Sequence, residues 1–260
     1  MEAVEETFVE KYDLFACIQC GKCTGGCPVS LKSPLNIRRL IYETLLFPEL
    51  EEVDGLKGLW DCTTCRTCMD RCPKGVKPME LIIGMRGLLV EEGRIETTIR
   101  DALESVFKHG NPWGRIRDKR SDWAEGLPVR NIAEVDGVVD VLYFVCCTAA
   151  YDPRVSEVAR AMVRSFNAAG VDFATLGNEE NCCGSEVRRM GEEGLFEMLV
   201  EDNTNLFKDL SFNRMVTTSP HCFNAFKNEY GDLGFEVLHY TQFVLSLIHI
   251  SEPTRLGMIS

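Results

Sequence analysis

Three features that would place this chain in a membrane or on nucleic acid are missing from its sequence. No apolar run is long enough to cross a bilayer, and the acidic first residues give no sign of a signal peptide. The 40 acidic residues outnumber the 28 basic ones, which leaves a formal charge of −12 and no basic face for nucleic acid. We therefore expect a cytoplasmic protein of one or two domains, with any contact to the inner face of a membrane made through a partner.

Cysteine, in contrast, is abundant. The chain of 260 residues has 13 cysteines, an odd number, and eight of them fall in two runs of identical spacing. The first run is Cys17-x2-Cys20-x2-Cys23-x3-Cys27-Pro28, and the second is Cys62-x2-Cys65-x2-Cys68-x3-Cys72-Pro73. Two copies of so regular a motif indicate one kind of site built twice.

An evenly spaced cysteine triplet followed by Cys-Pro is typical of [4Fe–4S] ligation in bacterial two-cluster ferredoxins, where the fourth cysteine binds the other cluster. Structural zinc prefers two separated Cys-x2-Cys pairs, and a disulfide framework needs an oxidising compartment. We therefore predict two [4Fe–4S] clusters. The predicted ligands of the first are Cys17, Cys20, Cys23 and Cys72. Those of the second are Cys62, Cys65, Cys68 and Cys27.

The segment around the two runs is predicted to be helical. The runs are separated by 34 residues (28–61), more than the hairpin of a small β-type ferredoxin needs. Ser33 followed by Pro34 predicts a helix N-cap and first helical residue, and a second helix is expected from Pro78 to Gly93. The sequence therefore predicts an α-helical ferredoxin domain over residues 1–94.

After a connector over residues 95–136, the pattern changes to strands alternating with helices. The predicted strands are Val138–Val145, Val171–Leu176, Arg214–Thr217 and Phe235–His239. Strands separated by helices imply right-handed βαβ units and a parallel sheet. We therefore expect a two-domain α+β protein whose second domain, residues 137–244, is Rossmann-like.

The remaining five cysteines all follow predicted strands, in the groups Cys146–Cys147, Cys182–Cys183 and Cys222. Because open α/β sheets bind ligands at the carboxyl ends of their strands, we expect these groups to meet at one edge. Cys146 is expected to point away from that edge, since neighbouring side chains on a strand alternate in direction. Gly184 is expected to let the backbone approach a bound group.

These motifs carry a family resemblance. The two ferredoxin runs, followed by Cys147, Cys182-Cys183-Gly184 and Pro220-His221-Cys222-Phe223-Asn224, resemble the group formed by the heterodisulfide reductase D subunit and the glycerol-3-phosphate dehydrogenase C subunit. That family pattern is one cysteine, a gap, Cys-Cys-Gly, a similar gap and Cys-x2-Cys, and both gaps here are 34 residues (148–181 and 185–218).

The resemblance implies a helical ferredoxin domain followed by a cysteine-rich "CCG" domain. The metal ligands that it implies in the CCG domain are Cys147, Cys182, Cys183 and Cys222. In some relatives this pattern holds a non-cubane [4Fe–4S] cluster that attacks a disulfide. In others it serves electron transfer beside a dehydrogenase.

Three features depart from the family pattern. Ser219 replaces the first cysteine of the final Cys-x2-Cys, and a hydroxyl ligates iron less well than a thiolate. Cys146 stands where relatives often have glycine. Residues 245–260 resemble the translation of a sequencing adapter, so we expect this tail to be non-native and to pack poorly.

Together these features predict an iron–sulfur electron-transfer subunit of a heterodisulfide-reductase-like oxidoreductase complex, with electrons passing between two [4Fe–4S] clusters and the CCG site. The alternative is an electron-wire or assembly subunit of a flavoprotein dehydrogenase, with a CCG domain that is non-catalytic or binds zinc. The CCG site would accordingly hold a third, non-cubane iron–sulfur cluster or zinc. Expected partners are redox subunits such as a flavoprotein, a cytochrome b or a hydrogenase. The sequence names neither catalytic residues nor a substrate.

Overall fold

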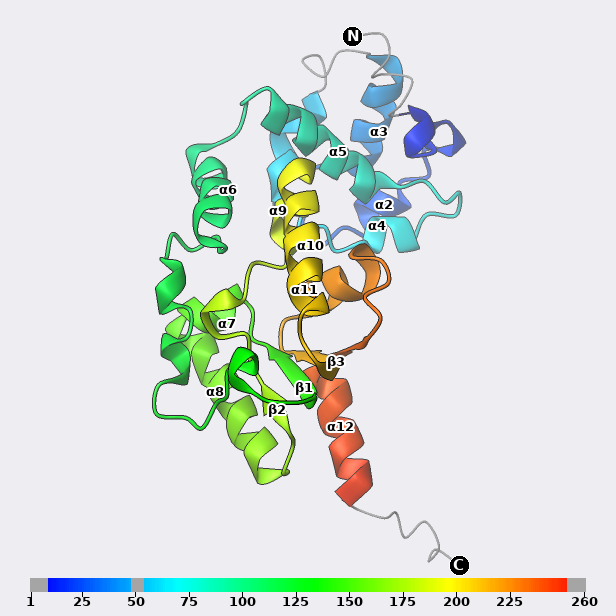
Figure 1. Cartoon of the computed structure of the whole chain (residues 1–260). Helices are drawn as coiled ribbons and strands as arrows, with labels where there is room; N and C mark the ends of the chain where they lie inside the picture. Colours follow the sequence, from blue (N-terminus) through cyan, green and yellow to red (C-terminus); the bar gives the residue numbers. More distant parts are fainter. Residues whose placement is uncertain (1–8, 48–53, 252–260) are drawn as a thin grey trace, which may run out of the picture. The chain divides into compact units, whose positions relative to one another are not determined.

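The computed structural model of this chain divides into two compact units (Figure 1). Unit 1 is Met1–Ile95 with Arg189–Glu192, and unit 2 is Glu96–Arg188 with Glu193–Ser260. The structure describes residues 9–47 and 54–251, without the side chains of residues 54–57 and 248–251. The segment expected as a connector, residues 95–136, is thus almost entirely part of unit 2.

Unit 1 is helical, as predicted, and it carries both cysteine runs. Its longer helices are α3 (Ile37–Leu46) and α5 (Pro78–Glu91). Its shorter elements are η1 (Leu14–Ala16), α2 (Lys22–Gly25), η3 (Asp54–Asp61) and α4 (Thr67–Asp70). Each cysteine run therefore has a short helix, α2 or α4, inside it.

The start of α3 differs from the prediction. The helix begins at Ile37, and Asn36 is its N-cap, with the side-chain oxygen accepting the backbone N–H of Arg39 at 3.0 Å. Ser33 lies outside the helix, where its hydroxyl donates to Asp61 at 2.5 Å and accepts the N–H of Leu35. The prediction that Ser33 caps this helix is therefore wrong, because Asn36 caps it and the Ser33 hydroxyl is bonded to Asp61 and Leu35.

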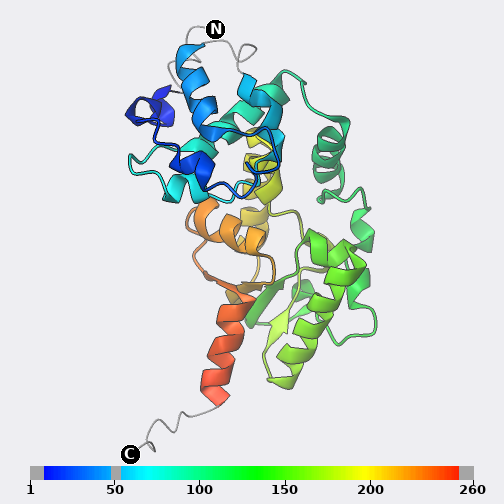
Figure 2. The same ribbon diagram turned by 180° about the vertical axis from the view of Figure 1, so that it is seen from behind.

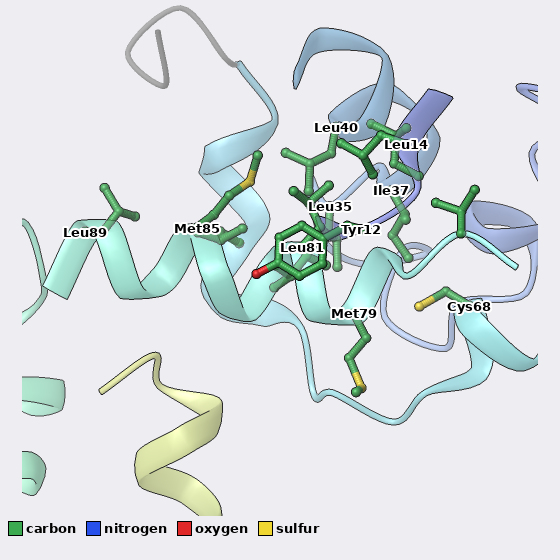
Figure 3. Close-up of a cluster of buried hydrophobic side chains, with 14 residues drawn as sticks. Tyr12, Leu14, Leu35, Ile37, Leu40, Cys68, Met79, Leu81, Met85 and Leu89 are labelled. Atoms are coloured by element: carbon green, nitrogen blue, oxygen red, sulfur yellow. The ribbon is translucent and has the colours of Figure 1, made fainter. Parts of the chain in front are cut away.

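Apolar residues from α3, from α5 and from the segment before the first cysteine run form the core of unit 1 (Figure 3). Leu81 and Met85 of α5 meet Ile37 and Leu40 of α3 in this core, and all four are buried. Cys68 is part of the cluster, and five more cysteines pack against it: Cys17, Cys23, Cys27, Cys62 and Cys72. Both cysteine runs therefore rest on an apolar base.

Unit 2 is built on a parallel sheet of four strands in the order β2-β1-β3-β4. The strands are β1 (Val139–Phe144), β2 (Phe173–Ala174), β3 (Phe212–Thr217) and β4 (Glu236–His239). The longer helices are α6 (Thr97–His109), α8 (Pro153–Ala168), α10 (Glu193–Lys208) and α12 (Tyr240–Ser251). The predicted Rossmann-like parallel sheet is confirmed.

Short helices occupy several of the connections in unit 2. After strands or loops come α7 (Cys147–Tyr151), α9 (Ser185–Arg189) and α11 (Pro220–Asn224), the last continued by a π-helical turn, η8 (Ala225–Glu229). Single 3₁₀ turns are η4 (Arg117–Lys119), η5 (Asp122–Ala124), η6 (Ile132–Glu134) and η7 (Gly177–Glu179). Two of these short helices, α7 and α11, begin next to cysteines of the predicted site.

Helices cover both faces of this sheet, which can be followed from behind in Figure 2. On one face, Tyr143 of β1 contacts Phe166 of α8 edge to face, at 5.5 Å between ring centroids. On the other face, Phe144 contacts Phe226 of η8 at 4.7 Å, and Phe226 contacts Phe207 of α10. The alternation of side chains along β1 therefore produces three layers and leaves the strand ends free to present the cysteines.

The tail that the sequence sets apart begins inside α12. Leu245 is 55% exposed, whereas Leu247 is partly buried against the core of unit 2. Residues 252–260 and the side chains of residues 248–251 lie outside the described part of the chain. The expectation that this tail packs poorly therefore stays a prediction. None of the described helices is both long enough and apolar enough to span a membrane.

The glycine of Cys-Cys-Gly is needed for packing. Gly184 has a φ of +74°, and a Cβ placed on it would lie 2.7 Å from a ring carbon of Phe196 and 3.4 Å from Leu199. Both neighbours belong to α10. In the structure Gly184 lets α10 pack directly against the cysteine loop, and the expected approach of its backbone to a bound group stays a prediction.

We expect Gly184→Ala to destabilise unit 2 by about 2–4 kcal/mol, from a left-handed alanine and from overpacking against Phe196. Gly170→Ala is the matched control, since Gly170 has a φ of +67° and nothing within 4 Å of its would-be Cβ. The control should lose only about 1–2 kcal/mol for the backbone conformation. Urea unfolding of both variants tests this, and equal losses would contradict the packing role.

Candidate metal centres

The two cysteine runs repeat the same backbone conformation. In each run, the residues two and four places after the first cysteine have positive φ: Gln19 (55°) and Gly21 (76°), then Thr64 (50°) and Arg66 (66°). A polar group donates to the first sulfur in each case, from the Gln19 side chain to Cys17 and from the Thr64 backbone to Cys62, both at 3.4 Å. Left-handed turns at these positions wrap each loop around its own sulfurs.

The structure brings the last cysteine of the second run to the first run. One cavity of unit 1 is lined by four sulfur-bearing residues together with loop backbone: Cys17, Cys20, Cys23 and Cys72. These are the four cysteines that the sequence assigns to the first cluster. The ligand assignment itself remains a prediction.

Cys27 of the first run lies near Cys62 of the second run. Burial raises the pKa of the Cys62 thiol, and the charges of nearby Cys27 and Cys65 raise it further. Burial likewise raises the pKa of Cys68, to about 12, with Cys62 as the strongest charged neighbour. Because one face of each loop rests on the apolar core, these sulfurs carry a proton in the metal-free chain and need a cationic centre to become thiolates.

Arg86 is a buried cation beside the second run, and sequence reasoning missed it. Its guanidinium donates to the carbonyl oxygens of Leu59 and Cys62, each at 2.7 Å, and lies 5.1 Å from the ring centroid of Trp60. Burial lowers the pKa of Arg86 and the charge of Cys62 opposes this shift, but an arginine stays protonated at neutral pH. A lone arginine in the apolar stretch of α5 was the available signal.

We expect Arg86→Gln to lower the reduction potential of the second cluster, because removing a buried positive charge destabilises the more negative, reduced state. The first cluster should change less. Arg66→Gln is the matched control: Arg66 is exposed and paired with Asp70 at 3.4 Å, so solvent screens its charge. Potentiometric titration followed by electron paramagnetic resonance checks this, and equal shifts in both variants would contradict it.

In unit 2, five cysteines form one series of sulfur contacts, which we call the thiol chain. Its order is Cys147, Cys182, Cys183, Cys222 and Cys146. The sulfurs of Cys183 and Cys222 are 3.2 Å apart, and in each other neighbouring pair one thiol lies close enough to shift the pKa of the next. The strand topology therefore brings the four predicted CCG cysteines together, along with a fifth.

That fifth residue, Cys146, corrects a prediction. Its side chain lies close enough to Cys222 to raise the pKa of that thiol, whereas alternation along β1 was expected to turn it away from the site. The strand ends at Phe144, and Cys146 has φ 79° and ψ 149°, which no regular strand contains. The alternation rule therefore fails here, because it stops applying two residues before Cys146.

Burial and hydrogen bonding set the thiol pKa values along the chain in opposite directions. A hydrogen bond with Cys182 and burial raise the pKa of Cys147 well above its ordinary value. Burial, with hydrogen bonds to Cys146 and Cys183, does the same for the pKa of Cys222. Cys183, which accepts hydrogen bonds from Cys182 and Cys222, has its pKa lowered to about 7. Hydrogen bonding from neighbouring thiols therefore favours the thiolate form of Cys183 over that of Cys147 or Cys222.

A fully buried ion pair lies beside Cys147. Arg120 donates to Glu180 at 2.7 Å and, from the same nitrogen, to the sulfur of Cys147 at 3.4 Å. Glu180 also accepts the backbone N–H groups of Val145 and Cys146, at 2.8 and 2.9 Å. Burial opposes the charge on Arg120, but the charges of Cys147 and Glu180 outweigh it and raise its pKa. Through this pair, the end of β1 is linked to Arg120 in the segment that precedes the sheet.

Two buried polar residues hold the Cys182–Cys183 loop from the α10 side. Asn203 donates to the carbonyl oxygen of Cys182 at 2.9 Å and to the hydroxyl of Tyr230 at 3.0 Å. That hydroxyl in turn donates to the carbonyl oxygen of Cys183 at 3.0 Å. Sequence reasoning missed both residues, although an asparagine on the apolar face of α10 was a usable signal.

Ser219 has a local structural task. Its hydroxyl accepts the backbone N–H of Cys222 at 3.3 Å and caps α11. A serine in this position is a good N-cap. The side chain that stands in place of the family's cysteine therefore already has a partner.

The cysteines of the two units suit the binding of iron–sulfur clusters better than the binding of a single metal ion. Within residues 9–47 and 54–251, no three His, Cys, Asp or Glu side chains gather closely enough to hold one metal ion. A zinc ion needs four donors within about 2.3 Å of one centre, whereas the cysteines of a cluster bind separate iron atoms. Soft sulfur donors alone, on an apolar base, match the cluster requirement.

We expect Arg120→Met to destabilise unit 2 by about 3–5 kcal/mol, because it leaves the Glu180 carboxylate buried without a cation. Adding Glu180→Gln should recover part of that loss, since the amide carries no charge and its one oxygen still accepts one of the two N–H groups. Arg130→Met is the surface control: it breaks a half-exposed pair with Asp172 and should cost less than about 1 kcal/mol. Urea unfolding measures all three, and a double variant no better than Arg120→Met would contradict the argument.

Two protein-family models match the chain. A 4Fe-4S dicluster domain matches residues 13–76, and a cysteine-rich domain, CCG, matches residues 141–227. The first match spans both cysteine runs and ends in unit 1. The second begins within β1, continues through β3 and contains the whole thiol chain. The two predicted domain types and the two [4Fe–4S] clusters are thereby confirmed, and the CCG match supports an additional iron–sulfur site.

Curated relatives agree with this division. The chain is 31% identical to a probable iron-sulfur-binding oxidoreductase, FadF, of Bacillus subtilis, over 91% of this chain and 42% of the relative. It is 31% identical to an EtfAB:quinone oxidoreductase of Syntrophomonas wolfei, over 91% and 40%. It is 29% identical to the heterodisulfide reductase D subunit of Methanosarcina barkeri, over 93% and 65%. The chain thus spans about two fifths of the first two relatives, and the predicted resemblance to the D subunit is confirmed.

Proposed function

We propose that this chain, which matches a 4Fe-4S dicluster domain and a cysteine-rich CCG domain, transfers electrons within an oxidoreductase complex. The path runs between two [4Fe–4S] clusters in unit 1 and a CCG centre in unit 2. The observation that carries this proposal is the grouping of Cys72 with the first run and of Cys27 with the second. Crossed pairing of this kind is the ligand pattern of bacterial two-cluster ferredoxins.

The first cluster is held by Cys17, Cys20, Cys23 and Cys72, and the second by Cys62, Cys65, Cys68 and Cys27. The CCG centre takes its ligands from Cys147, Cys182, Cys183 and Cys222. When bound, the clusters supply one-electron chemistry. The protein supplies the apolar base beneath the loops, the buried cation of Arg86 beside Cys62, and that of Arg120 beside Cys147.

The leading version is a heterodisulfide-reductase-like subunit, in which the CCG centre reduces a disulfide. It is supported by the similarity to the heterodisulfide reductase D subunit over 93% of this chain and by the thiol chain, which gathers sulfur donors around Cys183. In this version Arg120 holds Cys147 and neutralises part of the negative charge of the thiolates.

The second version is an electron-wire subunit that exchanges electrons with a flavoprotein. It is supported by the similarity to a protein named EtfAB:quinone oxidoreductase and by Ser219, which removes one expected sulfur ligand. Its partners would be a flavoprotein and a membrane-bound quinone site, so that this chain meets the membrane through a partner. Reoxidation of the reduced protein by a disulfide or by a quinone separates the two versions.

The cluster assignment is tested by anaerobic reconstitution of Cys72→Ser and Cys27→Ser. The unsubstituted protein should bind more than about eight iron atoms per chain, four for each cubane cluster and the rest at the CCG centre. We expect Cys72→Ser to alter the same spectroscopic signal as Cys20→Ser, because both ligate the first cluster. Cys27→Ser should alter the signal that Cys65→Ser alters.

The opposite pairing of variants and spectroscopic signals would contradict the crossed assignment. If Cys72→Ser instead changes only the signal that Cys65→Ser changes, each run ligates its own cluster and the crossed assignment is wrong. A chain that binds no iron above the level of a CCG-site variant such as Cys183→Ser has no centre in unit 2.

A further inference from the structure

Cys146 is held in a backbone conformation that suits glycine alone. Its φ of 79° and ψ of 149° fall in a region that residues with a Cβ avoid, and such strain persists only where the surroundings enforce it. The enforcing contacts are present. The N–H of Cys146 donates to Glu180 at 2.9 Å, and Glu180 is fixed by Arg120 and by the N–H of Val145.

The strained backbone aims the sulfur of Cys146 into the site. Its side chain lies close enough to Cys222 to raise the pKa of that thiol, and Cys222 lies 3.2 Å from Cys183, sulfur to sulfur. Cys147, the next residue, lies beside Cys182 and forms the opposite end of the thiol chain. The two adjacent cysteines therefore reach the two ends of the same series of sulfurs, which a regular strand would not permit.

Ser219 leaves one sulfur position of the site unfilled. Its hydroxyl is a hard donor and is already engaged with the N–H of Cys222 as the cap of α11. Cys146 contacts the same residue, Cys222, from the end of β1. Ser219, which lacks the thiol of the family pattern, and the additional cysteine, Cys146, therefore lie beside the same residue, Cys222.

We propose that Cys146 is a sulfur ligand of the CCG centre and occupies the ligand position left by Ser219. The centre then has five cysteine donors: Cys146, Cys147, Cys182, Cys183 and Cys222. This inference rests on the proposed function, since it needs an iron–sulfur centre in unit 2. It gives a role to a cysteine at a position where glycine would fit the backbone without strain.

The deciding experiment compares Cys146→Gly with the exchange variant Cys146→Gly/Ser219→Cys after anaerobic reconstitution. Iron and sulfide per chain are measured against Cys183→Ser, which reports the iron of unit 1 alone. We expect Cys146→Gly to lose at least half of the iron that the parent holds above that baseline. The exchange variant should regain it. Metal-free Cys146→Gly should unfold at the same temperature as the parent or higher, because glycine relieves the strain.

Cys146→Ala separates the sulfur from the backbone effect, since alanine keeps the Cβ and the strain but has no thiol. It should lose iron as Cys146→Gly does. If either single variant keeps the parent's iron, Cys146 is no ligand and the inference is overturned while the CCG centre stands. If the exchange variant fails to regain iron, Cys146 does not stand in for Ser219. If Cys183→Ser itself loses no iron, the CCG centre of the proposed function is absent.

Discussion

The carboxylate of Glu180 is the point on which the geometry of unit 2 depends. It accepts two consecutive backbone N–H groups at the end of β1 and the guanidinium of Arg120, and both charged side chains are buried. Removing two charges from water costs free energy, so this buried pair adds little net stability. It nevertheless permits few alternative conformations of the chain around it. What it determines is direction: the chain leaves β1 with Cys146 and Cys147 at opposite ends of one series of sulfurs.

Unit 1 solves the same problem of gathering sulfurs with backbone rather than with charge. Left-handed residues at matching positions of each run turn the loops around their cysteines, and the apolar core beneath keeps the thiols close to a dry surface. Only one buried cation, Arg86, lies among the described contacts of Cys62. The two units therefore reach sulfur clustering by different means, one by local conformation and the other by a long-range ion pair.

How much of this was readable in the sequence follows from the range of each interaction. The cysteine spacing and the strand–helix alternation are local patterns, and they predicted the helical unit, the parallel sheet and the meeting of four CCG cysteines. Sequence analysis missed four buried polar residues because their partners lie far away in sequence and because a buried polar residue produces no periodic pattern. These residues are Arg86, Arg120, Glu180 and Asn203. The direction of Cys146 was wrong for a related reason: a carboxylate 34 residues later bends the strand end.

The position of Arg120 has a consequence for how the cysteine-rich domain can be inherited or moved. The stretch shared with other CCG domains starts at residue 141, after Arg120, and yet Arg120 is the cation that neutralises Glu180 inside that stretch. A transplanted segment 141–227 would carry a buried carboxylate with no counter-charge and would need a new one from its host. The segment that matches the CCG domain is therefore shorter than the unit that folds. The stretch before it, which was predicted to be a connector, contributes Arg120 to the interior of that unit.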